Sequence, residues 1–411
     1  MKVCHVVYAF YETDTRVRMY AEALSERGDH VDVISLRKEG QARCEVVEGV
    51  HVNRIQPRVI NERNKATYLF RLIKFFMKSS AFLAKSTLNG DGRYDLIHIH
   101  SVPDFEVFAA LIPKLSGSKI ILDIHDIVPE FYASKFNVSE NSLIFKGLVL
   151  TERASTAFAD YVIVANHLWE RTLTERSVKK EKCSTFLNYP IPAFFRTYPK
   201  DRDDGKVVLV YPGSLNWHQG VDIAIRAFDR IKTRVPEAEF HIYGSGPAVG
   251  FLRKLVDERN MNNRVFIREF LPLDEIVPLM ASADIGVVPK RADSFGDQAF
   301  STKIFEFMAL GVPVIVSRTQ IDSFYFDDSV VKFFDSKDEE NLAEAMLELI
   351  RNRPLRTMLS RNAAAYIQGH SWSCRKKDYT RLVDEIAASG MCGKTPDSQS
   401  DSTHRVAGGR L

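Results

Sequence analysis

The sequence predicts an α/β protein with two doubly wound domains, each a parallel sheet covered by helices on both faces. Short apolar runs alternate with helix-length amphipathic segments along most of the chain, which is typical of strand–helix–strand units. A chain of 411 residues is also too long for a single compact core. Between two sets of such units lies a stretch rich in proline and charge, residues 189–206, which we expect to be a linker.

The composition is that of a globular protein with nearly balanced charge. The 56 basic and 53 acidic residues leave a formal net charge of +3, so charge gives no sign of nucleic-acid binding. Five cysteines are scattered without a C-x-x-C pair, which predicts free thiols in a reducing compartment and no metal site. The first apolar run meets Glu12 and Asp14 at once, and no run reaches membrane-spanning length, so we expect a cytoplasmic protein.

The first domain, residues 1–188, begins with a strand at 3–9, a polar loop at 10–15, a helix at 16–27 and a strand at 31–35. Ligands of parallel sheets bind beyond the carboxyl ends of the strands. The loop after the first strand, with Thr13, Asp14 and Arg16, therefore borders the predicted site. Arg16 either contacts a phosphate or acceptor group or is an ordinary charge on a helix surface.

His125 follows directly on a predicted strand at 119–124, with Asp126 beside it, so both lie at a carboxyl end. Such positions carry chemistry, and His125 is a candidate catalytic residue. His98 and His100 alternate along a predicted strand at 96–100. Without thiol or carboxylate partners they are weak metal ligands, and we interpret them as wall and core residues. The domain is completed by helices at 105–115 and 139–159, a strand at 161–164, a helix from 166 and a strand at 184–187.

Residues 65–85 form a predicted helix with two contrasting faces. Arg71, Lys74, Lys78 and Lys85 recur at helical spacing beside a broad aromatic face. A helix of this kind can lie on an anionic membrane surface. The pattern equally fits a domain helix whose basic edge faces solvent, and the sequence leaves both interpretations open.

The second domain, residues 207–370, restarts with a strand at 207–211, a loop at 212–220 and a helix at 221–234. The loop PGSLNWHQG lets the backbone approach a ligand, and its position after a first strand suits a diphosphate. Gly213, Ser214 and Gln219 are therefore candidate donor-binding residues, as is Gly244 after the strand at 239–243. The remaining segments are strands at 265–268, 285–289 and 330–334, helices at 273–281, 338–352, 355–368 and 372–389, and a tail at 390–411 expected to be disordered.

The stretch 295–317 predicts a loop, a short helix at 302–310 and a buried strand at 312–316. Ser301 or Thr302 can cap the helix, and Lys303 adds a full charge beside free N–H groups that suit a phosphate. Glu306, one turn deeper, can accept hydrogen bonds from two vicinal hydroxyls. A phosphate next to a diol indicates a nucleotide. The alternative is an ordinary amphipathic helix with an exposed lysine and glutamate.

The string STKIFEFMALGVPVIVS at 301–317 resembles the nucleotide-sugar-binding segment of retaining glycosyltransferases of family 4, which have the GT-B fold. Three more motifs are similar to those of the family, in the same order: D-x-R-V-R at 14–18, H-D-x-x-P-E at 125–130 and G-x-G-P at 244–247. The resemblance implies two facing Rossmann-like domains with a deep cleft, and a final helix, 371–389, that crosses back to the first domain. It also implies that Glu306 binds the ribose, that His125 reaches the donor sugar and that no divalent metal takes part.

One departure from the family pattern concerns the sugar. Gln298 stands where the family has the first of two glutamates, and a neutral amide can bind a hydroxyl but offers no charge. Asp297 or Asp293 is a candidate substitute. Phe270 and Leu271 are candidates for the base pocket.

A second departure concerns the diphosphate. Ser214 and Gln219 stand where many members have an arginine and a lysine. Lys303 and the helix start would then carry more of the charge neutralisation, with Lys290 or Arg16 as further cations.

We therefore expect a retaining glycosyltransferase without a cofactor that moves a sugar from a UDP- or GDP-sugar to a glycan or lipid-linked acceptor in envelope polysaccharide synthesis. If residues 65–85 contact lipid, the enzyme works at the inner face of the membrane. Two other classes stay open: a sugar-nucleotide 2-epimerase on the same fold, and a scaffold that binds sugar nucleotides without turnover.

Overall fold

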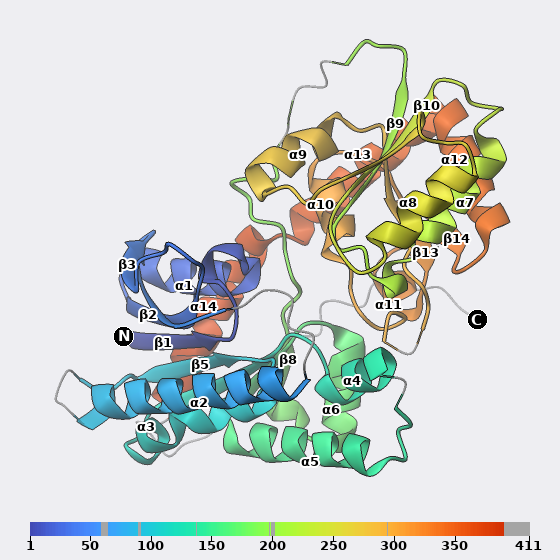
Figure 1. Ribbon diagram of the computed structural model, residues 1–411. Coiled ribbons are helices and arrows are strands. Elements are labelled where there is room, and N and C mark those ends of the chain that lie inside the picture. The colour runs from blue at the N-terminus through green and yellow to red at the C-terminus, as the bar shows by residue number, and fades with distance from the viewer. Residues whose placement is uncertain are drawn as a thin grey trace.

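The computed structural model describes residues 1–58, 65–88, 92–136, 138–196, 198, 202–293 and 295–389. The predicted tail at 390–411 lies outside these residues, as do positions 197 and 199–201 of the predicted linker. Figure 1 shows two lobes, each built on one sheet.

The first lobe contains an eight-stranded sheet in the order β3-β4-β2-β1-β5-β6-β7-β8. Its strands are β1 (Lys2–Val7), β2 (His30–Arg37), β3 (Cys44–Val47), β4 (Val50–Pro57), β5 (Leu96–His100), β6 (Lys119–Ile124), β7 (Tyr161–Val164) and β8 (Cys183–Thr185). Among these described strands, β3 alone pairs antiparallel with its neighbour. β1 lies between β2 and β5, where the strand order reverses, and doubly wound sheets bind ligands at such a point.

Helices cover both faces of this sheet (Figure 1). They are η1 (Tyr11–Thr13), α1 (Thr15–Glu26), α2 (Lys65–Leu88), η2 (Asp104–Ala110), α3 (Leu111–Leu115), α4 (Val128–Phe136), α5 (Leu143–Phe158), α6 (His167–Arg176) and η3 (Lys180–Lys182). Side chains of β1 alternate between the two faces: Val3 and Val7 pack in the core with α1, whereas Cys4 and Val6 pack in the core with α2. Burial on both faces explains why β1 reads as an apolar run instead of an alternating one.

The second lobe contains six parallel strands in the order β11-β10-β9-β12-β13-β14. These are β9 (Val207–Pro212), β10 (Ala238–Tyr243), β11 (Val265–Arg268), β12 (Ile285–Val288), β13 (Val314–Arg318) and β14 (Lys332–Asp335). The order places β9 beside β12 at a second reversal point, so the loops after these two strands mark the expected ligand position. The helices are η4 (Trp217–Gln219), α7 (Val221–Ile231), α8 (Val249–Glu258), α9 (Leu273–Ser282), α10 (Thr302–Ala309), α11 (Gln320–Tyr325), α12 (Glu339–Arg351), α13 (Arg353–Gly369) and α14 (Trp372–Ala388).

The final helix, α14, lies against the first lobe beside α1 (Figure 1). The hydroxyl of Tyr379 is 3.1 Å from Nδ1 of His98 in β5. Arg27 at the end of α1 forms a 2.8 Å ion pair with Asp384. The chain therefore returns from the second lobe to close one face of the first sheet.

The loops at the carboxyl edges of the two sheets contact each other. Phe295, in the loop after β12, packs against Phe131 of α4 and Trp169 of α6, with ring centroids 5.2 and 5.8 Å apart. The side-chain amide of Asn166 donates a 3.1 Å hydrogen bond to the carbonyl of Gln298. The ligand-binding edges that the topology predicts in each lobe are thereby brought to one interface.

Two strands and two α-helices are missing from the sequence-based prediction, each for a local reason. β3 and β4 form a hairpin whose turn residues, Glu48 and Gly49, have φ angles of 50° and 76°, values that suit a tight primed turn. α4 occupies the segment interpreted as a loop after His125, and Pro129 in its first turn fits a helix start. α11 has only six residues, too few to show a helical period. None of the described helices is long and apolar enough to cross a bilayer.

Candidate active site

The first turns of α10 carry the two charged candidate residues of this helix, Lys303 and Glu306. Ile304, Phe307 and Met308 are fully buried in the core, and this anchors one face of the helix. Lys303 and Glu306 lie on the other face and are half-buried. Gly311, with a φ of 66°, ends the helix after Leu310 because the left-handed conformation suits glycine.

The start of α10 is left without a side-chain cap. Ser301 occupies the N-cap position, but its hydroxyl makes no capping hydrogen bond. This hydroxyl is buried and has no hydrogen-bond partner in the described part of the chain. Thr302, in the first turn, hydrogen-bonds Glu306 instead. A buried hydroxyl beside uncapped N–H groups is a ready set of donors for an anion.

Lys303 extends from this helix start along the loop after β9. A Cβ atom on Gly213 would lie 2.5 Å from Lys303 Cε and would displace the end of the lysine side chain, and the φ of 131° at this position also favours glycine. The ammonium is 3.5 Å from Oε1 of Gln219 and lies over the ring of Tyr211. Burial lowers the pKa of Lys303, a shift that Glu306 opposes and Lys290 reinforces. The ammonium group is thus held in a partly desolvated position, where a charge interacts more strongly with an opposite charge than it does in water.

The negative charge of Glu306 also has no counter-ion in direct contact within the described residues. Burial raises the pKa of its carboxyl, although Lys303 and a hydrogen bond with Thr302 act in the opposite direction. Within the described ranges no ion pair of 4.0 Å or less joins Glu306 to Lys303. A half-buried carboxylate without a direct cationic partner is suited to accept hydrogen bonds from a ligand.

The loop after β9 is held in shape by close backbone contacts. A Cβ on Gly244 would lie 1.8 Å from the carbonyl oxygen of Gly213, so Gly244 serves loop packing. The hydroxyl of Tyr211 donates to the carbonyl of Ser214 at 2.7 Å and lies 3.2 Å from Oε1 of Gln219. The Ser214 side chain itself is exposed. Gly213 and Gln219 therefore border Lys303 directly, whereas Gly244 lies behind them.

The loop before α10 uses its polar groups mainly for its own structure. Oδ1 of Asp297 accepts a 2.8 Å hydrogen bond from the backbone N–H of Gln320, at the start of α11. The side-chain amide of Gln298 is 3.4 Å from Oε1 of Gln320. Oδ1 of Asp293 accepts a 2.6 Å bond from the backbone of Gly296.

Lys290, named from the sequence as a further cation, is buried. Its ammonium donates to the carbonyl of Ala299 at 2.6 Å and lies 3.0 Å from Oδ2 of Asp322. Because this charge already has a buried counter-ion, Lys303 is the better placed cation for a ligand.

In the first lobe, a buried cluster surrounds Asp123, the last residue but one of β6. Its two carboxylate oxygens accept hydrogen bonds of 2.8 and 2.7 Å from Arg16. Oδ2 also lies 3.0 Å from Nδ1 of His100 and 3.0 Å from Nε2 of His125. Burial alone would favour the neutral acid, but Arg16 and His125 hold the pKa of Asp123 well below its usual value. Asp123 is therefore a buried carboxylate shared by three partners.

Arg16 lies in the interior, so it is not an ordinary charge on a helix surface, and its contact with a phosphate or acceptor group stays a prediction. Beyond Asp123 it donates to the carbonyl of Phe186 at 2.6 Å and to Oδ1 of Asn188 at 2.9 Å. Asp14 accepts a 3.1 Å bond from the backbone of Val17 and caps α1. Asp126 is half-buried beside His125, and burial raises the pKa of its carboxyl.

His5, His98 and His100 form a buried group beneath this cluster. Their ring nitrogens lie within 4.8 Å of one another. A second group of atoms within the same distance consists of ring nitrogens of His100 and His125 and a carboxylate oxygen of Asp123. Hydrogen bonds account for several of these contacts: Nδ1 of His5 is 3.0 Å from Nε2 of His100, and His98 meets Tyr379. Burial lowers the pKa of all three imidazoles and so favours their neutral forms. His98 and His100 are core residues, as expected from the sequence.

Sequence reasoning missed Asp123 as the centre of the cluster. The signal was present, because a single acidic residue interrupts the apolar strand KIILDI two positions before His125 and so shares its face. It also missed His218, whose pKa is lowered by burial and by the nearby Lys303.

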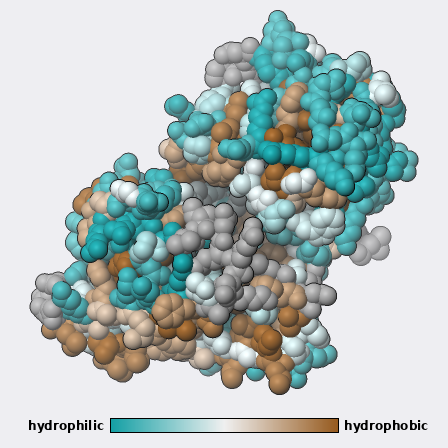
Figure 2. Space-filling view, in the orientation of Figure 1, coloured by the Kyte–Doolittle hydropathy of each residue, from teal (hydrophilic) through white to brown (hydrophobic). Residues whose placement is uncertain are grey.

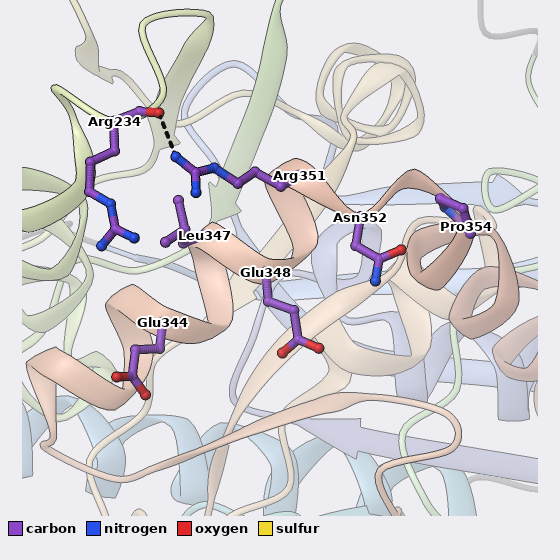
Figure 3. A pocket seen from close by; sticks show the side chains of 7 residues that line it. All are labelled: Arg234, Glu344, Leu347, Glu348, Arg351, Asn352 and Pro354. Carbon is purple, nitrogen blue, oxygen red and sulfur yellow. Dashed lines mark hydrogen bonds between the residues drawn. The ribbon is translucent and has the colours of Figure 1, made fainter.

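A surface hollow of about 630 Å³ lies elsewhere, along α12 (Figure 3). Its lining includes Arg234, Glu348 and Arg351. Arg351 donates to the carbonyl of Arg234 at 3.1 Å, and Glu348 pairs with Lys332 at 2.6 Å. Because none of these residues belongs to the loops after β9 or β12, we do not place the site there.

Two sequence families match the chain. The family described as glycosyl transferase 4-like domain matches residues 13–188, and the family described as glycosyl transferases group 1 matches residues 197–366. An uncharacterised glycosyltransferase of Methanocaldococcus jannaschii is 27% identical over 319 residues, which are 72% of this chain and 74% of that protein. The O-antigen biosynthesis glycosyltransferase WclY of Escherichia coli is 24% identical over 274 residues, 64% of this chain and 71% of its own.

Solved structures share the fold. Sucrose-phosphate synthase from Thermosynechococcus elongatus superposes with a TM-score of 0.76 at 19% identity, covering 95% of this chain and 100% of its own. HepE of Anabaena, solved in complex with UDP and glucose, gives a TM-score of 0.72 at 16% identity, covering 94% and 100%.

Proposed function

Because the chain belongs to the glycosyl transferases of group 1 and has the GT-B fold, we propose that it transfers a sugar from a nucleotide-diphosphate sugar with retention of anomeric configuration. The observation that carries the proposal is the uncapped start of α10, where Ser301 and Lys303 present donors next to Gly213. The diphosphate binds there, and Glu306 accepts hydrogen bonds from the ribose hydroxyls.

The chemical demand is to stabilise negative charge on the departing diphosphate while the sugar becomes oxocarbenium-like. Lys303 and the N–H groups at the start of α10 supply positive charge without a divalent metal, as the family resemblance implies. Partial burial strengthens this interaction, since the lysine is already desolvated before the ligand arrives. The acceptor then attacks on the face that the diphosphate leaves, which gives retention.

The first lobe supplies His125 to the donor sugar from across the interface. α4, which follows three residues after His125, meets Phe295 of the second lobe, so this part of the first lobe lies at the contact between lobes. Gln298 and Asp297 are proposed for the remote sugar hydroxyls. Both use protein contacts at present, so a small shift of the loop before α10 would accompany donor binding.

A UDP-sugar is our first choice of donor, because HepE, which shares the fold, was solved with UDP. Envelope polysaccharide or lipid-linked glycan synthesis is our choice of pathway class, since WclY acts in O-antigen biosynthesis. Phe270, which is exposed after β11, and the partly buried Leu271 are proposed for the base.

The test is a panel of UDP- and GDP-sugars screened by thermal stabilisation, followed by transfer to extracted lipid-linked glycans and NMR of the new anomeric centre. We expect stabilisation by one donor and an anomeric configuration identical to that of the donor. An inverted product would refute the mechanism. Conversion of the donor to its 2-epimer without acceptor would favour an isomerase, and binding without any transfer would favour a scaffold.

We further propose that α2 contacts an anionic membrane surface. Phe70 and Met77 of α2 are 66% and 61% exposed, and Leu115 of α3 and Leu143 of α5 are exposed on the same face of the first sheet. Figure 2 shows hydrophobic residues gathered along this face of the first lobe. Lys74 and Lys85 are exposed beside them, and the sequence of α2 contains no acidic residue. An apolar face with basic neighbours fits anionic lipid, and this would place a lipid-linked acceptor near the enzyme.

Sedimentation with vesicles tests this contact. We expect binding to vesicles that contain phosphatidylglycerol and little binding to pure phosphatidylcholine. Met77→Ser should weaken the binding, whereas Met358→Ser, at an exposed methionine on α13 of the other lobe, should not. Equal loss in both variants, or equal binding to both lipids, would refute it.

A further inference from the structure

His125 is linked to α1 by a continuous set of buried polar contacts. Its Nε2 lies 3.0 Å from Oδ2 of Asp123, and both oxygens of Asp123 accept from the guanidinium of Arg16. Asp123 is fully buried and Arg16 is 3% exposed. The carboxylate therefore cannot move toward solvent, and its position is set by a bidentate arginine.

The contacts also determine where the protons lie. An ionised carboxylate only accepts hydrogen bonds, so the two ring nitrogens within 3.0 Å of Oδ2, Nε2 of His125 and Nδ1 of His100, carry hydrogen in the arrangement that we infer. These two nitrogens also lie 3.1 Å from each other, and both reach the same carboxylate oxygen. Nε2 of neutral His100 is then an acceptor, which fits its 3.0 Å contact with Nδ1 of His5. One buried carboxylate thus fixes the tautomers of a row of histidines.

We propose that Arg16 and Asp123 are positioning residues that hold His125 with its proton on Nε2 and present its other ring nitrogen, Nδ1, to the donor sugar. This inference rests on the proposed role of His125 in transfer. A carboxylate that fixes the tautomer and orientation of a histidine is a recurring device in enzyme sites, and its loss acts through the histidine. Nothing in the sequence resemblance assigned a role to Asp123, and Arg16 acts on His125 from the interior, through Asp123.

A purely structural role for the pair would have different consequences. Other buried ion pairs in the first lobe, such as Arg176 with Glu152 at 2.6 Å, hold helices together without touching a histidine. Loss of such a pair lowers the unfolding temperature but leaves turnover of the folded enzyme unchanged. Glu152→Gln is therefore a matched control for removal of a buried carboxylate.

The first measurement is independent of activity. Nitrogen-15 NMR of histidine-labelled protein, with His125 assigned by its loss in His125→Gln, should show hydrogen on Nε2 of His125 in the wild type. Hydrogen on Nδ1 alone, or rapid exchange between the two tautomers, would overturn the proposal even if transfer is never detected. The pH range chosen must account for the titratable and charged groups that face His125, namely Asp123, Asp14, Arg16, His100 and Asp126.

The second measurement is a double-mutant cycle on sugar transfer. Asp123→Asn should lower kcat roughly tenfold to hundredfold with little change in the donor KM. In the His125→Ala background the same substitution should change kcat less than twofold, because Asp123 acts through His125. Glu152→Gln should leave kcat unchanged. Additive losses, or wild-type kcat in folded Asp123→Asn, would overturn the proposal, whereas absence of transfer by the wild type would refute the proposed function and leave the NMR result standing.

Discussion

The two halves of the candidate site treat their charges in opposite ways. In the first lobe, Asp123 is fully buried and accepts hydrogen bonds from Arg16, with His100 and His125 also in contact. In the second lobe, Lys303 and Glu306 are half-buried. Burial lowers the pKa of Lys303 and raises that of Glu306, so it favours the neutral form of both side chains. The hydroxyl of Ser301 beside them is a buried donor without a partner in the described chain.

This difference separates groups that shape a site from groups that await a ligand. A charge whose partners are already in place stabilises the fold and fixes its neighbours, and its removal leaves a buried partner unpaired. A charge that is partly desolvated without a close partner is unfavourable until a complementary ligand arrives. Removal of charge should therefore reduce stability in the first lobe, in addition to the effect of Asp123 on kcat through His125. In the second lobe it should reduce mainly activity.

The largest effect is expected for Asp123→Ala. This change leaves Arg16 buried without its counter-ion, and we expect a loss of about 3–5 kcal/mol in the free energy of unfolding. Urea denaturation followed by circular dichroism measures it. Asp384→Ala, which removes the largely exposed partner of Arg27, is the control and should cost roughly 1 kcal/mol or less. Comparable losses in the two variants would remove the distinction between the lobes.

Lys303→Ala tests the other half of the comparison. Turnover should fall roughly a hundredfold to a thousandfold, because a preorganised positive group at the leaving diphosphate is lost. Its thermal unfolding temperature without ligand should stay equal or rise, since burial disfavours the charged lysine. Steady-state kinetics and a thermal melt on the same preparation check both statements. Lys254→Ala, an exposed lysine on α8, should leave turnover unchanged.

A smaller effect is expected for Glu306→Gln. The amide keeps the shape but loses charged hydrogen bonds to the ribose, so nucleotide binding should weaken by roughly 1.5–3 kcal/mol. Because burial raises the pKa of Glu306, the folded state binds a proton more readily than the unfolded chain. The free energy of unfolding therefore falls as pH rises through the window between the ordinary pKa of a glutamate and the raised pKa of Glu306 in the folded protein. The unliganded variant should therefore be at least as stable as the wild type above this window. Calorimetric titration and melts test the pair of outcomes, and a loss of stability with unchanged affinity would contradict them.

The same distinction explains what the sequence could predict. Most strands, the α10 motif and the position of Lys303 and Glu306 follow from local periodicity and turn residues, which the sequence shows directly. The β3–β4 hairpin is an exception. Arg16 and Asp123 are 107 residues apart, so their pairing depends on strand order and cannot be read from either segment. The sequence likewise indicated that Lys290 is a free cation, because its counter-ion, Asp322, lies beside it only in the folded structure. Sequence patterns therefore located the half-buried charges proposed to bind a ligand, whereas they did not locate the buried charges that pair with each other.

The smallest effect is a difference in pH dependence between two histidines of the first lobe. Burial disfavours the charged form of His125, but Asp123 outweighs this and raises its pKa, whereas burial lowers the pKa of His98. His125 thus contributes stability that is fully present below its ordinary pKa of about 6.5 and is lost as pH rises through its value in the folded protein. The pH dependence is the opposite for His98, because its buried site favours the neutral imidazole. Its contribution to the free energy of unfolding is lost as pH falls below the ordinary histidine pKa. Unfolding free energies of His125→Asn and His98→Asn, each compared with the wild type across pH, should therefore diverge in opposite directions. Parallel curves would mean that Asp123 does not act on His125 more strongly than burial does. The contrast between paired charge around Asp123 and unpaired charge at Lys303 and Glu306 would then lose its main support.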